Sequence, residues 1–235
     1  MTEKRNPLSA ESDRAIALAD AQRKATKLFD RIAADLIRPG VSESQLTREI
    51  ADLGRREFGI ETNWHKRLVR AGTNTLAIYN ENPPERVLGD DDIVFIDLGP
   101  VFAEWEADVG RTYVIGNDPH KLRLRDDAER AFAAGKQYFK DHPEITGSQL
   151  FAFIKSLAEK TGWEFAGIIA AHLVSEFPHK SLAENMTTGY ANEAHHEPMR
   201  GLDSLGRERH WILEIHFVDR ARGIGAFFEE LLTVD

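Results

Sequence analysis

Four segments of the sequence carry apolar residues at the three- and four-residue spacing that is typical of an amphipathic helix. The pattern predicts a first helix over residues 9–37, which ends at Pro39-Gly40 because this pair does not continue a helix. Further helices are predicted from Ser42, over residues 122–139 and from Thr146. Ser42 and Thr146 are each followed three residues later by glutamine, which is the pattern of a capping box.

The strand signals lie between and after these helices. β-Branched and aromatic residues fill residues 93–98, and residues 108–115 are the expected antiparallel partner after a turn at Gly99-Pro100. Later strands are predicted over residues 168–174, 210–218 and 225–234, and loops over residues 80–84 and 184–205. Together these segments predict helices that pack on a sheet.

The two predicted caps belong to a longer stretch of internal sequence similarity. The segment VSESQL at residues 41–46 resembles ITGSQL at residues 145–150, which lies 104 residues later, and matched apolar positions follow both. Capped helices share a common pattern, so chance alone could produce one such match. A predicted helix precedes each copy, which favours duplication: one domain over residues 1–235, with related halves at about 10–115 and 116–235.

Composition and charge narrow the range of partners. The chain has 235 residues, with 30 Lys+Arg against 39 Asp+Glu and a formal net charge of −9. An acidic balance argues against nucleic acid as a partner, since proteins that bind a phosphate backbone usually carry a basic face. The length is sufficient to bury a sizeable core.

Three further features concern the cellular compartment. The chain contains no cysteine, which excludes disulfides, thiolate nucleophiles and cysteine-ligated zinc. The longest nearly apolar run, residues 165–174, is about half the length of a membrane-spanning helix. No apolar segment of signal-peptide type follows the first residues. We therefore expect a cytoplasmic protein that does not associate with a membrane.

Two aspartates suggest a metal site. Asp97 closes an apolar strand, where an ionised carboxylate is costly unless it is paired or bound to a metal. Asp108 follows eleven residues later, so a hairpin would bring the two carboxylates together, and a divalent cation would relieve their repulsion. The alternative is that both aspartates lie in surface loops, with Arg111 paired to one of them.

Acidic residues also interrupt the late strands. Glu214 lies within the apolar segment 211–218, where strand alternation places it on one face together with His216. Glu229 and Glu230 are adjacent in the last predicted strand, so alternation puts one of them on each face. Only one of this pair is therefore expected to reach a site formed with Glu214.

Among the nine histidines, His172 interrupts an apolar strand, and His179 follows seven residues later. An isolated histidine in such a strand is more often a core residue bonded to backbone, but the buried carboxylates favour a metal ligand here. One imidazole with four carboxylates suits two divalent ions such as Mn, Fe, Co or Zn. Most of the others are expected to be exposed or internally satisfied, namely His65, His120, His142, His195, His196 and His210.

Along the chain, an Asp at the end of a strand is followed by a second Asp eleven residues later, by a His with another His seven residues after it, and by two strand glutamates. This order resembles the pita-bread metallopeptidase superfamily, which includes methionine aminopeptidase, aminopeptidase P, prolidase and the metal-free creatinase. The resemblance runs over essentially the whole chain and corresponds to the catalytic domain only. The sequence motifs that carry the resemblance are LIRPGV at 36–41, GDDDIVFIDLG at 89–99 and DVGRTY at 108–113. It implies an α+β pita-bread fold, with two pseudo-symmetric α/β halves and a central, largely antiparallel sheet that cradles the metals.

The resemblance also implies a role for each candidate ligand. Asp97 would chelate one metal, and Asp108 would bridge both metals. His172 and Glu214 would ligate the second metal, and Glu229 would form the other bridge. The cofactor implied is therefore a pair of divalent ions, with Mn, Co, Fe and Zn as the candidates.

The last ligand and the catalytic residues also follow from the family pattern. Glu229 is chosen over Glu230 because the family glutamate stands five residues before a strand valine, here Val234. His179 matches the family histidine that contacts the substrate carbonyl and steadies the tetrahedral intermediate. Glu214 would shuttle the proton as general base and then general acid.

The departures from the family concern the substrate pocket. Family peptidases usually surround the ligand histidine with glycines, whereas the neighbours here are Ala171, Leu173 and Val174. Tyr79 stands near the position of a substrate-facing family histidine, and His216 replaces a proline or another small residue. Contacts with the substrate are assigned to Tyr79, His179 and His216.

Three functions are compatible with these features. The leading one is a dinuclear metal-dependent hydrolase that cleaves an amide bond near a free N-terminus, most like an Xaa-Pro aminopeptidase or dipeptidase. The second function would use the same fold and metal site to act on a small non-peptide substrate, as in a creatinase-like C–N hydrolase. A third is a non-catalytic binding module, which should have lost ligands. An apolar face on the first helix would allow a homodimer, and it could equally pack on the sheet.

Overall fold

The structure is a computed structural model that describes residues 7–178 and 188–234; His179 and the start of the predicted loop 184–205 lie outside these residues. Its strands are β1 (Leu68–Ala71), β2 (Asp92–Leu98), β3 (Val101–Phe102), β4 (Trp105–Glu106), β5 (Val109–Ile115), β6 (Glu164–Phe165), β7 (Ala171–Val174), β8 (Tyr190–Ala191), β9 (His210–Asp219) and β10 (Ile224–Leu231). Eight of them form a sheet in the order β1–β2–β5–β10–β9–β7–β8, with β6 beside β9. Every pairing in this sheet is antiparallel.

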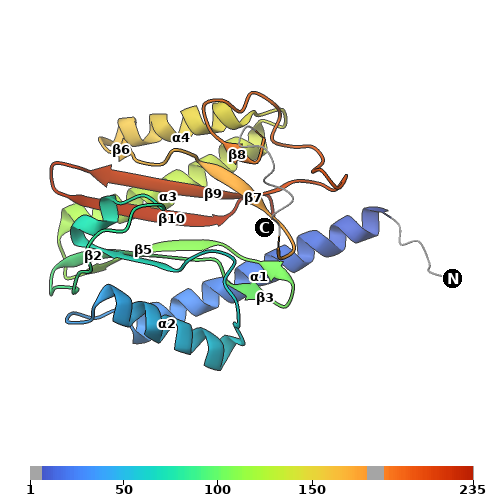
Figure 1. Cartoon of the computed structure of the whole chain (residues 1–235). Coiled ribbons are helices and arrows are strands. Elements are labelled where there is room, and N and C mark those ends of the chain that lie inside the picture. The colour runs from blue at the N-terminus through green and yellow to red at the C-terminus, as the bar shows by residue number, and fades with distance from the viewer. Residues whose placement is uncertain (1–6, 179–187, 235) are drawn as a thin grey trace.

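Four helices pack on this sheet, namely α1 (Pro7–Asp35), α2 (Glu43–Phe58), α3 (Pro119–Asp141) and α4 (Gly147–Thr161). α1 and α2 share an apolar core with β1, β2 and β5, whereas α3 and α4 share one with β9 and β10 (Figure 1). A short 3-10 helix, η1 (Gly72–Leu76), follows β1 and contacts β10. The α+β class and the central antiparallel sheet that the sequence predicts are therefore confirmed.

Strand alternation divides the residues of the sheet between two faces. In β2, Ile96 belongs to the core beneath α1 and α2, whereas Asp97 faces the opposite side. In β9, Leu213 belongs to the core beneath α3 and α4, whereas Glu214 and His216 line a pocket on the opposite side. The helices thus bury one face of the sheet and leave the other face to form a site.

The caps predicted for two helices are present, but they differ. Thr146 forms a complete capping box: its hydroxyl accepts from the Gln149 backbone, and the Gln149 side chain accepts from the Thr146 backbone. Ser42 accepts from the backbone N–H of Gln45, but the Gln45 side chain donates to Glu49 instead. Only the cap of α4 is therefore reciprocal.

The main differences from the predicted elements are short strands. The predicted 93–98 and 108–115 pair is confirmed as β2 and β5, but a β3–β4 ribbon, rather than a turn at Gly99-Pro100, connects them. The predicted strand over 168–174 begins only at Ala171, and β1, β6 and β8 were not predicted. Strands of two to four residues are too short for period-2 alternation to be recognised.

Nothing in the geometry tests the duplication inferred from the two caps, which stays a prediction. Among the helices of residues 7–178 and 188–234, none is both long enough and apolar enough to cross a membrane.

Replacing Thr146 by Ala should lower the free energy of unfolding by about 1 kcal/mol, because the first turn of α4 loses its side-chain acceptor. Urea unfolding measures this loss. Ser156→Ala in the same helix is the matched control, since the Ser156 hydroxyl only donates to a carbonyl within the helix. An equal loss in both variants would contradict this role of the cap.

Candidate metal centre

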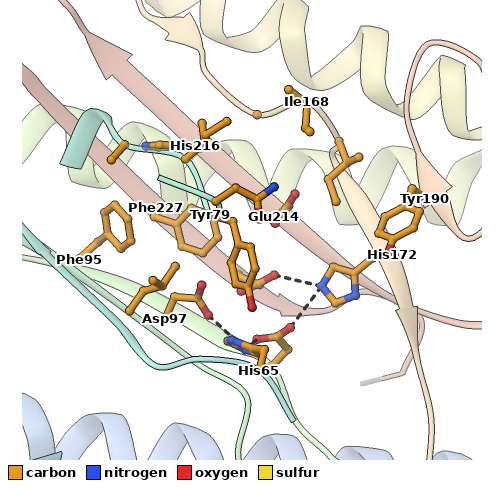
Figure 2. Close-up of a pocket in the computed structure, with 18 of the residues that line it drawn as sticks. His65, Tyr79, Phe95, Asp97, Ile168, His172, Tyr190, Glu214, His216 and Phe227 are labelled. Atoms are coloured by element: carbon orange, nitrogen blue, oxygen red, sulfur yellow. Dashed lines mark hydrogen bonds and ion pairs between the residues drawn. The ribbon is translucent and has the colours of Figure 1, made fainter. Parts of the chain in front are cut away.

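The open face of the sheet carries a cavity of about 520 Å³. Its floor is formed by β1, β2, β9 and β10, and its walls by residues 77–80, 165–173 and 189–190. Acidic and imidazole groups gather at one end, with Asp97, His65 and His172 turned toward one another (Figure 2). Phe95, Phe227 and His216 form the other, aromatic end.

The carboxylates are brought together by the register of four strands. Asp97 on β2 lies opposite Gly110 on β5, Gly110 lies opposite Glu229 on β10, and Glu229 lies opposite Glu214 on β9. Asp108 immediately precedes β5 and reaches the same cluster. A side chain at Gly110 would collide with the Phe227 ring and lie 3.0 Å from the Glu229 Cβ. This glycine therefore lets the acidic residues meet across the row.

Two imidazoles lie against these carboxylates. His172 Nε2 is 3.2 Å from Asp108 Oδ2 and 3.3 Å from Glu229 Oε1. His65 Nε2 is 3.1 Å from Asp108 Oδ1 and 3.5 Å from Asp97 Oδ1. Asp108 thus lies between the two histidines, with one oxygen facing each.

The pKa values of the carboxyl groups in the cluster are strongly shifted. Burial raises the pKa of Asp97 to about 7, with repulsion from Asp108 adding to the shift. Burial also raises the pKa of Glu214 to about 7 and that of Glu229 well above its ordinary value. Burial alone would raise the pKa of Asp108 too, but the adjacent His65 and the second imidazole lower it to about 2.

The imidazoles respond in the opposite direction. Burial lowers the pKa of His65, but the charges of Asp108 and Asp97 outweigh it and raise the pKa to about 10. The pKa of His172 is likewise raised well above its ordinary value: burial lowers it, but the hydrogen bonds that His172 donates to Asp108 and Glu229 outweigh burial. Without a metal, the cluster is therefore neutralised by protons held on imidazoles and on some of the carboxyls.

The donor set fits divalent cations. Asp97 Oδ1 is buried and accepts no hydrogen bond from the residues that the structure describes. Two groups of donor atoms, each within 4.8 Å of one another, share Asp108: one with His65 and Asp97, the other with His172 and Glu229. Carboxylate oxygens and imidazole nitrogens are ligands for Mn, Fe, Co and Zn. These groups are the residues that could hold metals.

The candidate ligands that the sequence suggested, Asp97, Asp108, His172, Glu214 and Glu229, all line the cavity.

Two alternatives concerned neighbouring residues, namely Glu230 as the last ligand and Arg111 as the partner of one aspartate. Glu230 lies on the opposite face of β10 and pairs with Arg111. Arg111 therefore does not pair with Asp97 or Asp108, and these aspartates are buried rather than in surface loops.

The residues assigned to the substrate have different environments. The Tyr79 ring lines the cavity, 6.1 Å from the His65 ring. His216 Nε2 donates to the carbonyl of Thr75 at 2.8 Å, and burial lowers the pKa of His216 to about 4, which keeps it neutral. His216 thus serves as part of the aromatic wall, while His179 lies outside the described residues.

His65 is the residue that sequence reasoning missed. It was expected to be exposed or internally satisfied, yet its side chain is only 7% exposed and lies within the acidic cluster. It belongs to no strand, so no periodicity marks it. In the structure, Gly99 makes room for it, because a Cβ there would overlap the rings of His65 and Trp64.

Comparison with known proteins bears directly on this centre. A sequence model of metallopeptidase family M24 matches residues 17–233. The chain belongs to metallopeptidase family M24. Members of this family are hydrolases that use divalent metals, and the acidic cluster of this M24 chain provides candidate ligands for them.

Solved structures share the M24 fold at low sequence identity. They include a prolidase from Thermococcus sibiricus (TM-score 0.74, 19% identity, 95% of this chain and 57% of that one). Dipeptidase PepE from Mycobacterium ulcerans matches with a TM-score of 0.72 and 24% identity, over 94% of this chain and 54% of that one. An Xaa-Pro dipeptidase from Bacillus anthracis matches with a TM-score of 0.69 and 20% identity, over 96% of this chain and 58% of that one. The chain thus spans little more than half the length of these structures. No curated protein matches the sequence significantly.

Replacing Glu214 by Gln should stabilise the metal-free M24 chain at pH 8 more than at pH 5. The pKa of Glu214 is raised from 4.5 to about 7 in the folded state, so the unfolded chain releases this proton first as the pH rises. Glu214 therefore costs the wild type stability between about pH 4.5 and pH 7, and the variant lacks this contribution. Urea unfolding with a chelator should show the advantage of the variant growing by about 1 kcal/mol or more, and a pH-independent difference would refute it.

Proposed function

We propose that this chain is a dinuclear metal-dependent hydrolase that cleaves an amide bond near a free N-terminus, most like an Xaa-Pro aminopeptidase or dipeptidase. The observation that carries the proposal is the pair of donor groups that share Asp108 at the end of one cavity. Asp97 would hold one cation, His172 and Glu214 the other, and Asp108 and Glu229 both. When bound, such cations supply a nucleophile at neutral pH and polarise the scissile carbonyl.

Glu214 is the residue best placed to move a proton. It lies on β9 at the junction between the acidic end and the aromatic end of the cavity (Figure 2). Its pKa, which burial raises to about 7, lies where a carboxyl can both accept a proton and return it. Glu214 would therefore take the proton of the attacking water and pass it to the leaving amine, a contribution of about 10² to 10⁴-fold in rate.

The rest of the cavity supports a substrate with a free amine and an apolar neighbouring group. The acidic end offers carboxylate oxygens, which accept hydrogen bonds from an ammonium group. The aromatic end offers Phe95, Phe227 and the neutral His216. Among the lining residues in the described part of the chain, none is Lys or Arg.

The second candidate function is the hydrolysis of a small non-peptide C–N substrate. Leu173, Tyr79 and His216 line the cavity where the family pattern differs, and they favour this alternative. A protein that binds two metals but cleaves none of a panel of dipeptides and Xaa-Pro peptides would support it. The binding-module alternative is disfavoured because all five candidate ligands face the cavity.

Replacing Asp108 by Asn should abolish metal binding and peptide cleavage together, because Asp108 contributes to both donor groups. Elemental analysis of protein purified without chelator should give about two transition-metal ions per chain in the wild type and a loss of both in the variant. Turnover of Xaa-Pro peptides by the variant at the rate of the wild type would refute the assignment.

The adjacent glutamates of β10 offer a matched pair of variants. Glu229→Gln should lower the metal content and lose the rise in Tm that Mn²⁺ or Co²⁺ produces, because Glu229 faces the donor cluster. Glu230→Gln should retain both properties, since Glu230 pairs with Arg111 on the opposite face. Thermal unfolding with and without added metal distinguishes them, and the reverse pattern would show that Glu230 is the ligand.

A further inference from the structure

We propose that His65 is a direct metal ligand, added to the carboxylates Asp97 and Asp108, so that each of two cations receives one imidazole: His65 for the first and His172 for the second. The inference deepens the proposed function and rests on its metal site. It adds a nitrogen donor to a position that the family pattern fills with carboxylates only.

The hydrogen bonds of the His65 ring determine which nitrogen can bind a metal. His65 Nδ1 is 2.8 Å from the carbonyl oxygen of Lys66, and a carbonyl only accepts, so Nδ1 carries a proton. The Nε2 lone pair of the neutral ring then points at the oxygens of Asp108 and Asp97, 3.1 and 3.5 Å away. A lone pair opposite carboxylate oxygens is repulsive unless a proton or a cation lies between them.

His172 repeats this arrangement on the other side of the cluster. Its Nδ1 is 3.1 Å from the carbonyl oxygen of Leu173, which is again the next residue in the chain. Its Nε2 faces Asp108 and Glu229. A backbone carbonyl that holds Nδ1–H and turns Nε2 toward the metal is the usual outer-sphere support of a metal-binding histidine. The two imidazoles are therefore equivalent in geometry, although only His172 interrupts a strand.

The position of His65 is held by backbone and by packing rather than by a loose loop. The Trp64 N–H donates to the carbonyl of Gly99 at 2.8 Å, and Asn63 forms a bridge with Pro100. The Trp64 ring donates to the carbonyl of Ala107 at 3.0 Å and packs edge-on against His65. These contacts tie His65 to the two ends of the segment that carries Asp97 and Asp108.

A nitrogen ligand changes which metals the first position should prefer. Carboxylates alone suit Mn²⁺, whereas imidazole suits Zn²⁺, Fe²⁺ and Co²⁺ better. His65 should therefore strengthen the binding of Co²⁺ and Zn²⁺ at the Asp97 position more than that of Mn²⁺. The variant His65→Ala removes this nitrogen and leaves both carboxylates in place.

Titration with Co²⁺ tests the proposal. Wild type should bind two ions, and His65→Ala should bind one ion normally and the other at least about tenfold more weakly, with a smaller loss for Mn²⁺. The control His142→Ala should match the wild type, since His142 lies beyond the end of α3 and bonds the Tyr138 carbonyl. Two tightly bound Co²⁺ ions in His65→Ala would overturn the proposal.

A second measurement needs no variant and so does not depend on folding of His65→Ala. In protein labelled with ¹⁵N-histidine and loaded with ¹¹³Cd²⁺, two cadmium NMR signals should appear, each split by one imidazole nitrogen. Two signals of which only one is split would overturn the role of His65 and leave the dinuclear site intact. The absence of any bound cadmium, cobalt or manganese in the wild type would instead overturn the proposed function.

Discussion

Mutual repulsion among four buried carboxylates is the constraint on which this structure depends. Asp97, Asp108, Glu214 and Glu229 meet on one face of the sheet, where burial favours their neutral forms. Such an arrangement persists in a folded protein only if protons, imidazoles or cations compensate the charge. Two histidines lie against the carboxylates, and both they and the unsatisfied Asp97 oxygen belong to groups that could hold metals. Strongly shifted pKa values of this kind are common at functional sites, and this cluster is the candidate functional centre.

The remaining structure stabilises the sheet on which this cluster lies. The helices α1, α2, α3 and α4 pack against the apolar face, so the acidic face contributes little to the core and is free to form the cavity (Figure 1). Two glycines permit close approach: Gly110 between the rows of Asp97 and Glu229, and Gly99 beneath His65. The 3-10 helix η1 is tied to the same sheet, because the Thr75 hydroxyl accepts from Gly225 and its carbonyl accepts from His216. Strands thus carry Asp97, His172, Glu214 and Glu229, whereas Asp108 immediately precedes β5 and His65 is held by its neighbours.

The cavity combines candidate metal ligands at one end with aromatic and rim residues elsewhere. Most of the candidate metal ligands come from strand positions whose orientation is set by register. The groups that would contact a substrate come from the segments around the rim and from the far end of the strands, including Tyr79 and His216. Low identity to prolidases and dipeptidases of the same fold is compatible with this division, since rim residues can change without disturbing the register.

The sequence alone predicted the long helices, the long strands and four of the groups that line the cavity, namely Asp97, Asp108, His172 and Glu214, because these depend on local periodicity and on the cost of placing charge in an apolar strand. It also implied that Glu229 and Glu230 face opposite sides, since alternation is a local property. Only the tertiary structure decided that Glu229 faces the cluster, through its register with Gly110 and Glu214. Only the tertiary structure placed His65 there as well. Its position depends on contacts with Gly99, Pro100 and Ala107, more than thirty residues away, which no local pattern encodes.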